Sequence, residues 1–237
     1  MSRPLFLTLA VVALLAQPAT AQHSDVEFEY HNNQIDFHSG EPSGLDAAVL
    51  FEGEFPVGGP SGNFTSDPGF ASEVSEGLGV NPGDQIWINF IVSPSLGGFL
   101  QYHDGTDFAS TTANILVADN SPGSIDPMIF EGSVSGDNPV FLQTADGIGD
   151  IHSHVDFTLS AGADQGAYAL LMQLQTSAPG ISDSDPFWFI FNHGLDEDTF
   201  ENVVVPAFQS SAIPEPGTLG LIGIAALAIT CRRRRSA

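Results

Sequence analysis

The amino-acid sequence predicts an all-β domain, a single β-sandwich of jelly-roll or immunoglobulin-like type that ends in one short helix. Short apolar runs alternate with clusters of Gly, Pro, Asp, Asn and Ser along most of the chain, the pattern of many short strands joined by turns. Regular alternation of strand and helix patterns is not visible, so a doubly wound parallel sheet is not expected. The segment 22–212 is long enough to bury a core unaided.

The expected strands have turn residues between nearly all of them, as at Asn81-Pro82-Gly83-Asp84. These strands are 26–30, 34–38, 47–51, 85–92, 98–102, 113–117, 128–134, 140–144, 152–159, 167–175 and 187–191. No internal repeat or domain boundary is visible between them. The segment 22–212 is therefore expected to form one domain.

One helix is expected late in this domain, at 197–204. Asp196 can cap its N-terminus, because a carboxylate accepts hydrogen bonds from the unpaired backbone N–H groups there. Leu195 and Phe200 have the spacing of a hydrophobic staple around that cap. Pro206 is expected to end the helix.

The first 21 residues have the organisation of a secretory signal peptide. Arg3 supplies positive charge, the segment 5–15 is apolar, and Ala19-Thr20-Ala21 provides small residues at a cleavage position. An uncleaved N-terminal anchor is the alternative interpretation. The pattern predicts export, with the mature chain beginning at Gln22.

The segment 213–237 contains a proline-bounded acidic residue, an almost wholly apolar stretch at 218–231 and an arginine cluster. An apolar helix of this length can only just cross a bilayer. The arginines are expected to stay on the cytoplasmic side. A plain C-terminal membrane anchor is one interpretation of this segment. The residues concerned are Pro214, Glu215, Pro216, Arg232, Arg233, Arg234 and Arg235.

The order of these three parts resembles the PEP-CTERM sorting signal. The resemblance implies recognition and cleavage by an exosortase in a Gram-negative bacterium that makes extracellular polysaccharide. It also implies anchoring through the C-terminal helix before processing, and then a place at the cell surface or in the extracellular matrix. Extracellular polysaccharide is accordingly a candidate partner.

Charge is distributed very unevenly along the chain. The five basic residues are Arg3 and the four tail arginines, whereas all of the 29 acidic residues except Glu215 lie in 22–212. Such a segment repels nucleic acid and anionic lipid, so neither is an expected partner. The acidic surface suits saline surroundings, divalent cations or cationic partners. The one cysteine, Cys231, lies in the tail, so no disulfide is expected.

The strongest local motif for chemistry is Asp150-Ile151-His152-Ser153-His154-Val155-Asp156-Phe157. Residues two apart in a strand share a face, so His152, His154 and Asp156 are expected to point the same way. Two imidazoles at this spacing can bind one Zn²⁺ ion if other residues complete the site. The candidates for completion are His31, His38 and His103. Histidines that only form hydrogen bonds on a polar face are the alternative.

A second resemblance concerns the order of segments in 26–205. A strand with acidic and histidine residues at 34–41 precedes Gly83-Asp84-Gln85-Ile86-Trp87, the His-x-His strand and a closing segment at 188–195. This order resembles the Zur-repressed PEP-CTERM proteins and the related choice-of-anchor M surface proteins. The resemblance implies a β-rich surface domain linked to zinc supply, with His38, His152 and His154 as ligands.

Three function classes remain open from the sequence. The first is a non-enzymatic surface or matrix protein that binds zinc, because no catalytic motif such as Gly-x-Ser-x-Gly or His-Glu-x-x-His is present. The second is an adhesion module that binds Ca²⁺ or polysaccharide, through acidic loops or an aromatic platform. The third is a hydrolase of matrix polymers with paired carboxylates. The acidic loop residues are Asp104, Asp107, Asp119, Asp126, Asp183 and Asp185, and the aromatic residues, otherwise expected in the core, include Trp87, Tyr102, Trp188 and Phe189.

The excess of carboxylates predicts a salt-dependent stability for the segment 22–212. Raising NaCl from about 0.01 M to about 0.15 M shortens the screening length from about 30 Å to about 8 Å. Because screening weakens repulsion among the carboxylates, the melting temperature is expected to rise. Thermal denaturation followed by circular dichroism measures this change, and a melting temperature independent of NaCl would contradict the prediction.

Overall fold

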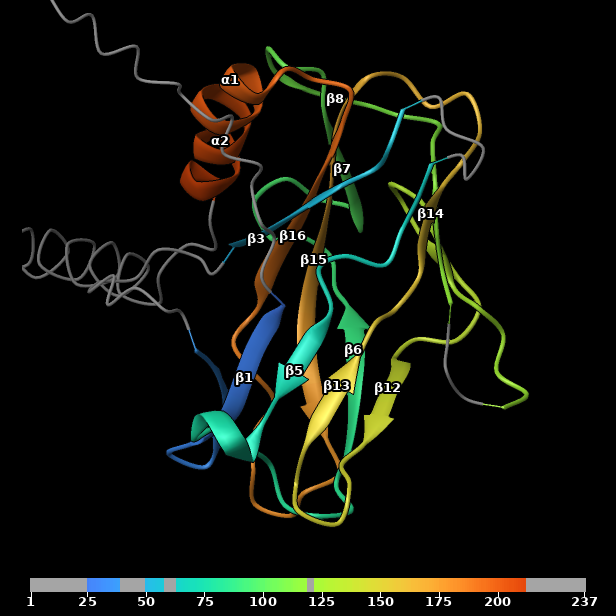
Figure 1. The fold of residues 1–237 in the computed structure, drawn as a ribbon. Helices are drawn as coiled ribbons and strands as arrows, with labels where there is room; N and C mark the ends of the chain where they lie inside the picture. Colours follow the sequence, from blue (N-terminus) through green and yellow to red (C-terminus); the bar gives the residue numbers. More distant parts are fainter. Residues whose placement is uncertain (1–24, 39–49, 58–62, 119–121, 212–237) are drawn as a thin grey trace, which may run out of the picture.

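The computed structural model describes residues 25–38, 50–57, 63–118 and 122–211. These residues form three β-sheets and one short helical segment near the C-terminal end (Figure 1). The prediction of a β-rich domain that ends in one short helix is confirmed. The predicted signal peptide at 1–21 and the sorting segment at 213–237 lie outside the described residues.

The three sheets have four, five and seven strands within the described residues. The four-stranded sheet has the order β13 (Ile151–Ser153), β5 (Phe70–Ser72), β1 (Val26–His31) and β2 (Gln34–Phe37). The five-stranded sheet has the order β11 (Val134–Ser135), β10 (Met128–Ile129), β9 (Ile115–Val117), β14 (Phe157–Leu159) and β4 (Phe64–Thr65). The seven-stranded sheet contains β12 (Val140–Thr144), β6 (Gln85–Phe90), β15 (Gly166–Thr176), β16 (Phe187–His193) and β3 (Leu50–Glu54), with β7 (Leu100–His103) and β8 (Phe108–Ala109) beside β15.

One apolar core joins all three sheets. Phe28 of the four-stranded sheet, Phe157 of the five-stranded sheet and Phe189 of the seven-stranded sheet belong to the same fully buried cluster. Alternate residues of β6 face this cluster, so that Ile86 and Ile88 are fully buried. The assignment as a single jelly-roll or immunoglobulin-like sandwich stays a prediction.

The other face of the seven-stranded sheet is partly covered by the helical segment. It comprises α1 (Glu197–Thr199), a π-helical turn η2 (Phe200–Val204) and α2 (Val205–Ser210). Phe208 of α2 packs on Trp188 of β16, with ring centroids 5.3 Å apart. This second buried cluster fixes the helix to the sheet.

The helix begins as predicted but continues beyond the predicted end. The Asp196 carboxylate accepts a hydrogen bond from the backbone N–H of Thr199 at 3.0 Å, as an N-cap does. Leu195 packs against the cluster that contains Phe200. The expectation that Pro206 ends the helix is wrong, because Pro206 lies in the first turn of α2 after the wider π turn. A proline is tolerated in the first turn of a helix, because its fixed φ matches the helical value.

Two neighbouring segments of the polypeptide cross together from one sheet to another. The chain passes from β13 of the four-stranded sheet to β14 of the five-stranded sheet, and β5 and β4 are related in the same way. The pairings Ser153↔Phe70 and Phe157↔Thr65 enclose three residues on the segment that joins β13 to β14. They enclose four residues on the segment that joins β4 to β5. This mismatch interrupts regular pairing, so the single strand predicted at 152–159 is wrong.

Two other parts of the chain also differ from the expected strand pattern. The expected strand 128–134 is a hairpin of β10 and β11, closed by the hydrogen bond from the Phe130 N–H to the Ser133 carbonyl. The long loop between β3 and β5 contains β4, which pairs with β14. A one-turn 3-10 helix, η1 (Val74–Glu76), follows β5. No helix within the described ranges combines the length and apolar character that crossing a membrane requires.

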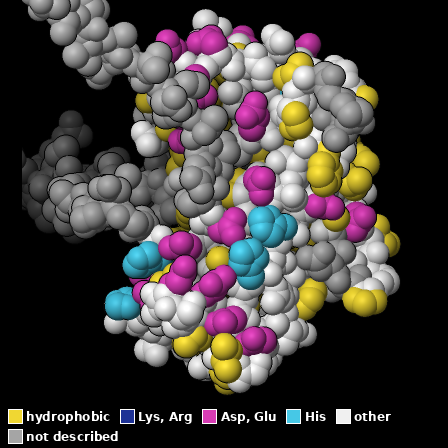
Figure 2. Space-filling model, viewed as in Figure 1, with side chains coloured by type: hydrophobic (Ala, Val, Ile, Leu, Met, Phe, Trp, Pro, Cys, Tyr) yellow, Lys and Arg dark blue, Asp and Glu magenta, His cyan; other side chains and the backbone are white. Residues whose placement is uncertain are grey.

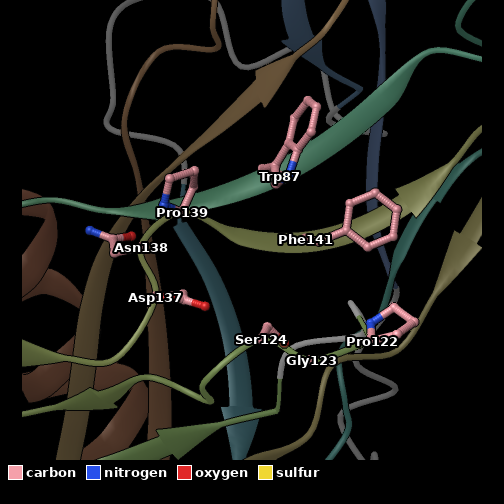
Figure 3. Close-up of a pocket in the computed structure, with 8 residues that line it drawn as sticks. All are labelled: Trp87, Pro122, Gly123, Ser124, Asp137, Asn138, Pro139 and Phe141. Atoms are coloured by element: carbon pink, nitrogen blue, oxygen red, sulfur yellow. The ribbon is translucent and has the colours of Figure 1, made fainter.

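The surface has two distinct features. Acidic and histidine side chains gather over β1, β5 and β13 on the face seen in Figure 2. A shallow pocket of about 510 Å³ lies on the seven-stranded sheet, next to Trp87 and Phe141 (Figure 3). These two features are the candidates for function.

Removing the Phe208 ring should detach the helix from the sheet. Phe208 is fully buried, and a Phe→Ala change at such a position costs about 3–5 kcal/mol of unfolding free energy. Val203 on the same helical segment is 41 % exposed, so Val203→Ala should change stability by less than about 0.5 kcal/mol. Urea denaturation measures both variants. Equal stabilities for the two variants would contradict this account.

Candidate metal centre

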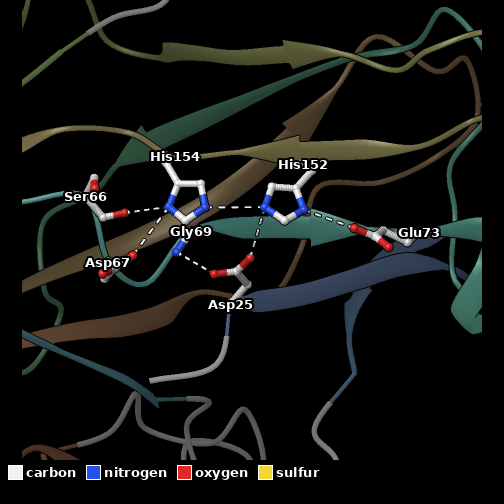
Figure 4. A network of polar contacts seen from close by, with 7 residues as sticks. All are labelled: Asp25, Ser66, Asp67, Gly69, Glu73, His152 and His154. Carbon is white, nitrogen blue, oxygen red and sulfur yellow. Dashed lines mark hydrogen bonds and ion pairs between the residues drawn. The ribbon is translucent and has the colours of Figure 1, made fainter. Parts of the chain in front are cut away.

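The crossing between sheets brings two histidines and an aspartate together on the surface. The mismatch follows Ser153, yet inward and outward positions still alternate through the crossing. Ile151 and Val155 are buried, while His152 and His154 are exposed. Asp25 lies immediately before β1, which pairs in parallel with β5. These residues meet over Gly69 (Figure 4).

The three side chains form a compact group. The Nε2 atoms of His152 and His154 are 3.3 Å apart, and His152 Nε2 lies 3.5 Å from Asp25 Oδ2. One ligand atom from each residue lies within 4.8 Å of the other two. Among the described residues, these three side chains are the one cluster of histidine, cysteine or acidic groups arranged closely enough to hold a metal ion.

In each of these three side chains, the polar atom that does not face the other two forms a hydrogen bond with a neighbouring residue. His152 Nδ1 is 3.0 Å from the Glu73 carboxylate, and His154 Nδ1 is 2.9 Å from the Ser66 carbonyl oxygen. Both partners can only accept, so each Nδ1–H donates and each neutral ring carries its lone pair on Nε2. The other carboxylate oxygen of Asp25 accepts from the Gly69 N–H at 3.0 Å. Hydrogen bonds of this kind orient the ligands of metal sites.

This hydrogen bonding has a direct electrostatic consequence. With both Nδ1 atoms protonated, the neutral rings present two lone pairs to one another across 3.3 Å. A cation is needed between them, either a proton on one Nε2 or a metal ion. Two nitrogens each about 2.0–2.1 Å from a tetrahedral Zn²⁺ lie about 3.3 Å apart. The observed separation of the two Nε2 atoms therefore fits a shared Zn²⁺.

Gly69 allows the His154 ring to occupy its position. A Cβ atom added to Gly69 would lie 2.7 Å from His154 Cε1, and 2.9 Å from each of its ring nitrogens. The Gly69 carbonyl accepts from the Val26 N–H at 2.8 Å, which holds the start of β1 beside β5. The backbone of Gly69 thus positions Asp25, and its missing side chain leaves room for His154.

Acidic neighbours favour positive charge at the site. The hydrogen bond to Glu73 raises the pKa of His152 above its usual value, burial opposes this, and the charges of Asp25 and Glu73 add to the rise. The Asp67 carboxylate lies 3.5 Å from His154 Nδ1. In the absence of a metal ion, protonation of His152 is thus favoured.

The structure places the predicted site residues in different regions. His152 and His154 come together as the strand alternation indicated. His38 and Asp156 are exposed but lie outside the group, and the predicted His103 is buried on β7. There its Nδ1 accepts from the Gly105 N–H, and burial lowers its pKa. His31 is an exposed residue at the end of β1.

Sequence reasoning missed Asp25 and Glu73. Asp25 is 127 positions from His152 in the numbered sequence, and only the parallel pairing of β1 with β5 brings it near. Glu73 directly follows β5, whose Ala71 pairs with His152. The sequence shows an acidic residue next to β1 and another next to β5, but it does not show that β1 pairs with β5 or that β5 pairs with β13.

In one of the acidic loops, a carboxylate already accepts hydrogen bonds from the backbone of the same loop. Asp104 accepts from the N–H groups of Thr106 and Asp107 and from the Thr106 hydroxyl. These bonds, the hydroxyl first, lower the pKa of Asp104 to about 2. Asp119 lies outside the described residues. Ca²⁺ binding in these loops stays a prediction.

Fold and site thus define an acidic, β-rich domain with a surface His/Asp triad. Residues 212–235 match the PEP-CTERM protein-sorting motif. The motif implies an exported protein that is processed by an exosortase and anchored through its C-terminal segment beforehand. No match was found among curated proteins or solved structures, so the resemblance to Zur-repressed and choice-of-anchor M proteins stays a prediction.

A methyl group at Gly69 should disrupt the triad without unfolding the domain. Gly69→Ala forces the His154 ring to shift, because the added Cβ would lie 2.7 Å from His154 Cε1, and loss of such a positioning contact typically weakens metal affinity by about 10- to 100-fold. Gly132→Ala is the matched control, because a Cβ there meets nothing within 4 Å. Zinc titration and thermal melting measure both variants. Equal zinc affinity in the two would contradict the proposed role of Gly69.

Proposed function

We propose that this chain is a non-enzymatic cell-surface or matrix protein whose β-sandwich binds one Zn²⁺ ion through Asp25, His152 and His154. The sorting motif supports the surface location. The observation that carries zinc binding is the fixed orientation of both imidazoles. Both Nδ1–H groups are engaged by acceptors, so both Nε2 atoms turn to one point.

Zinc is favoured over calcium by the type of ligand. Calcium takes six to eight oxygen ligands, whereas two of the three ligands here are imidazole nitrogens. Zn²⁺ accepts a mixture of histidine and carboxylate ligands in a tetrahedral arrangement. Cu²⁺ binds such ligands more tightly than Zn²⁺ when both are available. Three protein ligands leave a fourth position for water or another molecule.

Exposure supports a binding role in preference to catalysis. The side chains of His152 and His154 are 55 % and 39 % exposed, and that of Asp25 is 23 % exposed. Catalytic metals usually act in enclosed sites, where excluded water strengthens electrostatic stabilisation of the transition state. An exposed site suits reversible capture of metal ions from the surroundings. Hydrolysis of matrix polymers remains the competing proposal.

Zinc binding is expected at one ion per chain. Isothermal titration with Zn²⁺ should give a stoichiometry near one, and the double variant His152→Ala, His154→Ala should lose this binding. Asp25→Asn should retain weaker binding, since an amide oxygen is a poorer ligand than a carboxylate. His38→Ala is the matched control, because His38 is an exposed histidine outside the triad. Unchanged binding in the double variant, or no stoichiometric binding, would refute the proposal.

The pH dependence of stability should reverse when zinc is added. Because the pKa of His152 is raised on folding, its protonation stabilises the metal-free fold fully below the unfolded pKa of about 6.5. This contribution disappears as pH rises through the folded pKa. Zinc requires the neutral rings, so its stabilisation grows over the same interval. Melting temperatures against pH, with and without Zn²⁺, should therefore have opposite slopes, and equal slopes would contradict the site.

A further inference from the structure

The helix leaves part of the seven-stranded sheet uncovered on its outer face. Trp87 of β6 and Phe141 of β12 are directly paired across the strands there. Their ring centroids are 6.0 Å apart with an interplanar angle of 65°. Both rings are partly exposed and line the shallow pocket of about 510 Å³ (Figure 3). By contrast, Trp188 and Phe189 are buried.

Amide side chains extend this aromatic pair across the sheet. Gln175 of β15 is paired with Trp87, and Gln173 is paired with Asn89. The NH₂ groups of Gln175 and Gln173 donate to Asp183 and to the Ser184 carbonyl. These bonds hold the two side chains in place and leave their carbonyl oxygens as acceptors. Within the described part of the chain, no side-chain partner is found for Asn89.

Asp137 adds a carboxylate at the edge of the pocket. One of its oxygens accepts from the Ile125 N–H at 3.0 Å. The neighbouring Asn138 side chain is bound to the backbone of Phe90 through both its oxygen and its nitrogen. The pocket is thus built on fixed side chains and backbone.

The combination of chemistries selects a ligand with both apolar faces and hydroxyl groups. Aromatic rings stack on flat apolar surfaces, and the C–H faces of a pyranose ring provide such surfaces. Amide and carboxylate groups accept and donate hydrogen bonds at the ring edge, where sugar hydroxyls lie. A shallow, open pocket accommodates a segment of a long chain without enclosing its ends.

Charge decides which polysaccharides fit. The segment 22–212 contains no lysine or arginine, and Asp137 lies at the pocket. Uronate or sulfate groups would meet carboxylates without a compensating cation, which costs free energy. The face therefore suits uncharged sugars.

From these observations we propose that the Trp87–Phe141 face binds neutral polysaccharide chains. The site is separate from the triad, because the triad lies where the chain crosses between the four- and five-stranded sheets, whereas this face belongs to the seven-stranded sheet. Each contact is weak, and repeated contacts along one polymer held by many surface-anchored copies supply avidity.

Affinity electrophoresis of the full chain tests this proposal. The protein is solubilised in a detergent without a sugar headgroup and run through gels that contain hydroxyethylcellulose, galactomannan or polygalacturonate. Retardation is expected in at least one of the two neutral polymers and not in polygalacturonate. Trp87→Ala should weaken the interaction by about tenfold, and Trp87→Phe by less.

Two further variants distinguish binding from a folding defect. Asn89→Ala removes a side chain without a partner within the described chain and should weaken retardation while leaving the melting temperature unchanged. Phe64→Ala is the control, because Phe64 is a 36 % exposed aromatic residue on β4 of the five-stranded sheet. Failure of both neutral polymers to retard the wild type would overturn the proposal. So would retardation that survives in both Trp87→Ala and Asn89→Ala. Neither result bears on zinc binding, which depends on other residues.

Discussion

The contact between the His154 ring and the backbone of Gly69 is the constraint on which the candidate centre depends. Any residue with a Cβ at position 69 would displace the His154 ring, because that Cβ would lie 2.7 Å from His154 Cε1. The same residue donates its N–H to Asp25 and accepts from Val26. One glycine therefore holds the ring of one ligand, the carboxylate of another and the start of β1. This arrangement at Gly69 arises where two segments of the polypeptide cross between the four- and five-stranded sheets.

The acidic character of the domain favours a bound cation at the triad. Asp25, Glu73 and Asp67 surround two imidazoles, and the segment 22–212 contains no lysine or arginine to balance them. Histidine is the only side chain of this segment that can become cationic. A proton or a divalent ion at the triad therefore relieves local repulsion as well as satisfying two lone pairs. The two outer faces differ accordingly, one charged and histidine-bearing, the other aromatic and amide-bearing.

Much of this arrangement could be predicted from period-two alternation and capping rules. The alternation of Ile151, His152, Val155 and Phe157 indicated which side chains are buried, and Asp196 indicated where the helix begins. The contribution of Asp25 could not be predicted, because it depends on the parallel pairing of β1 with β5, far apart in the chain. His103 was misjudged since a histidine on a strand gives no sign of which face is covered. Trp87 and Trp188 likewise look alike in sequence, and only the extent of the helix distinguishes them.

In the proposed centre, the Nε2 atoms of His152 and His154 bind one Zn²⁺ while their Nδ1–H groups stay bonded to Glu73 and Ser66. Long-range ¹H–¹⁵N NMR of the histidine rings during Zn²⁺ titration tests it residue by residue. We predict that both rings adopt the Nδ1–H tautomer, with Nε2 shifts that change together and saturate at one equivalent, while His38 and His103 are unaffected. Nε2 resonances of His152 and His154 that ignore Zn²⁺, or coordination through Nδ1, would contradict it.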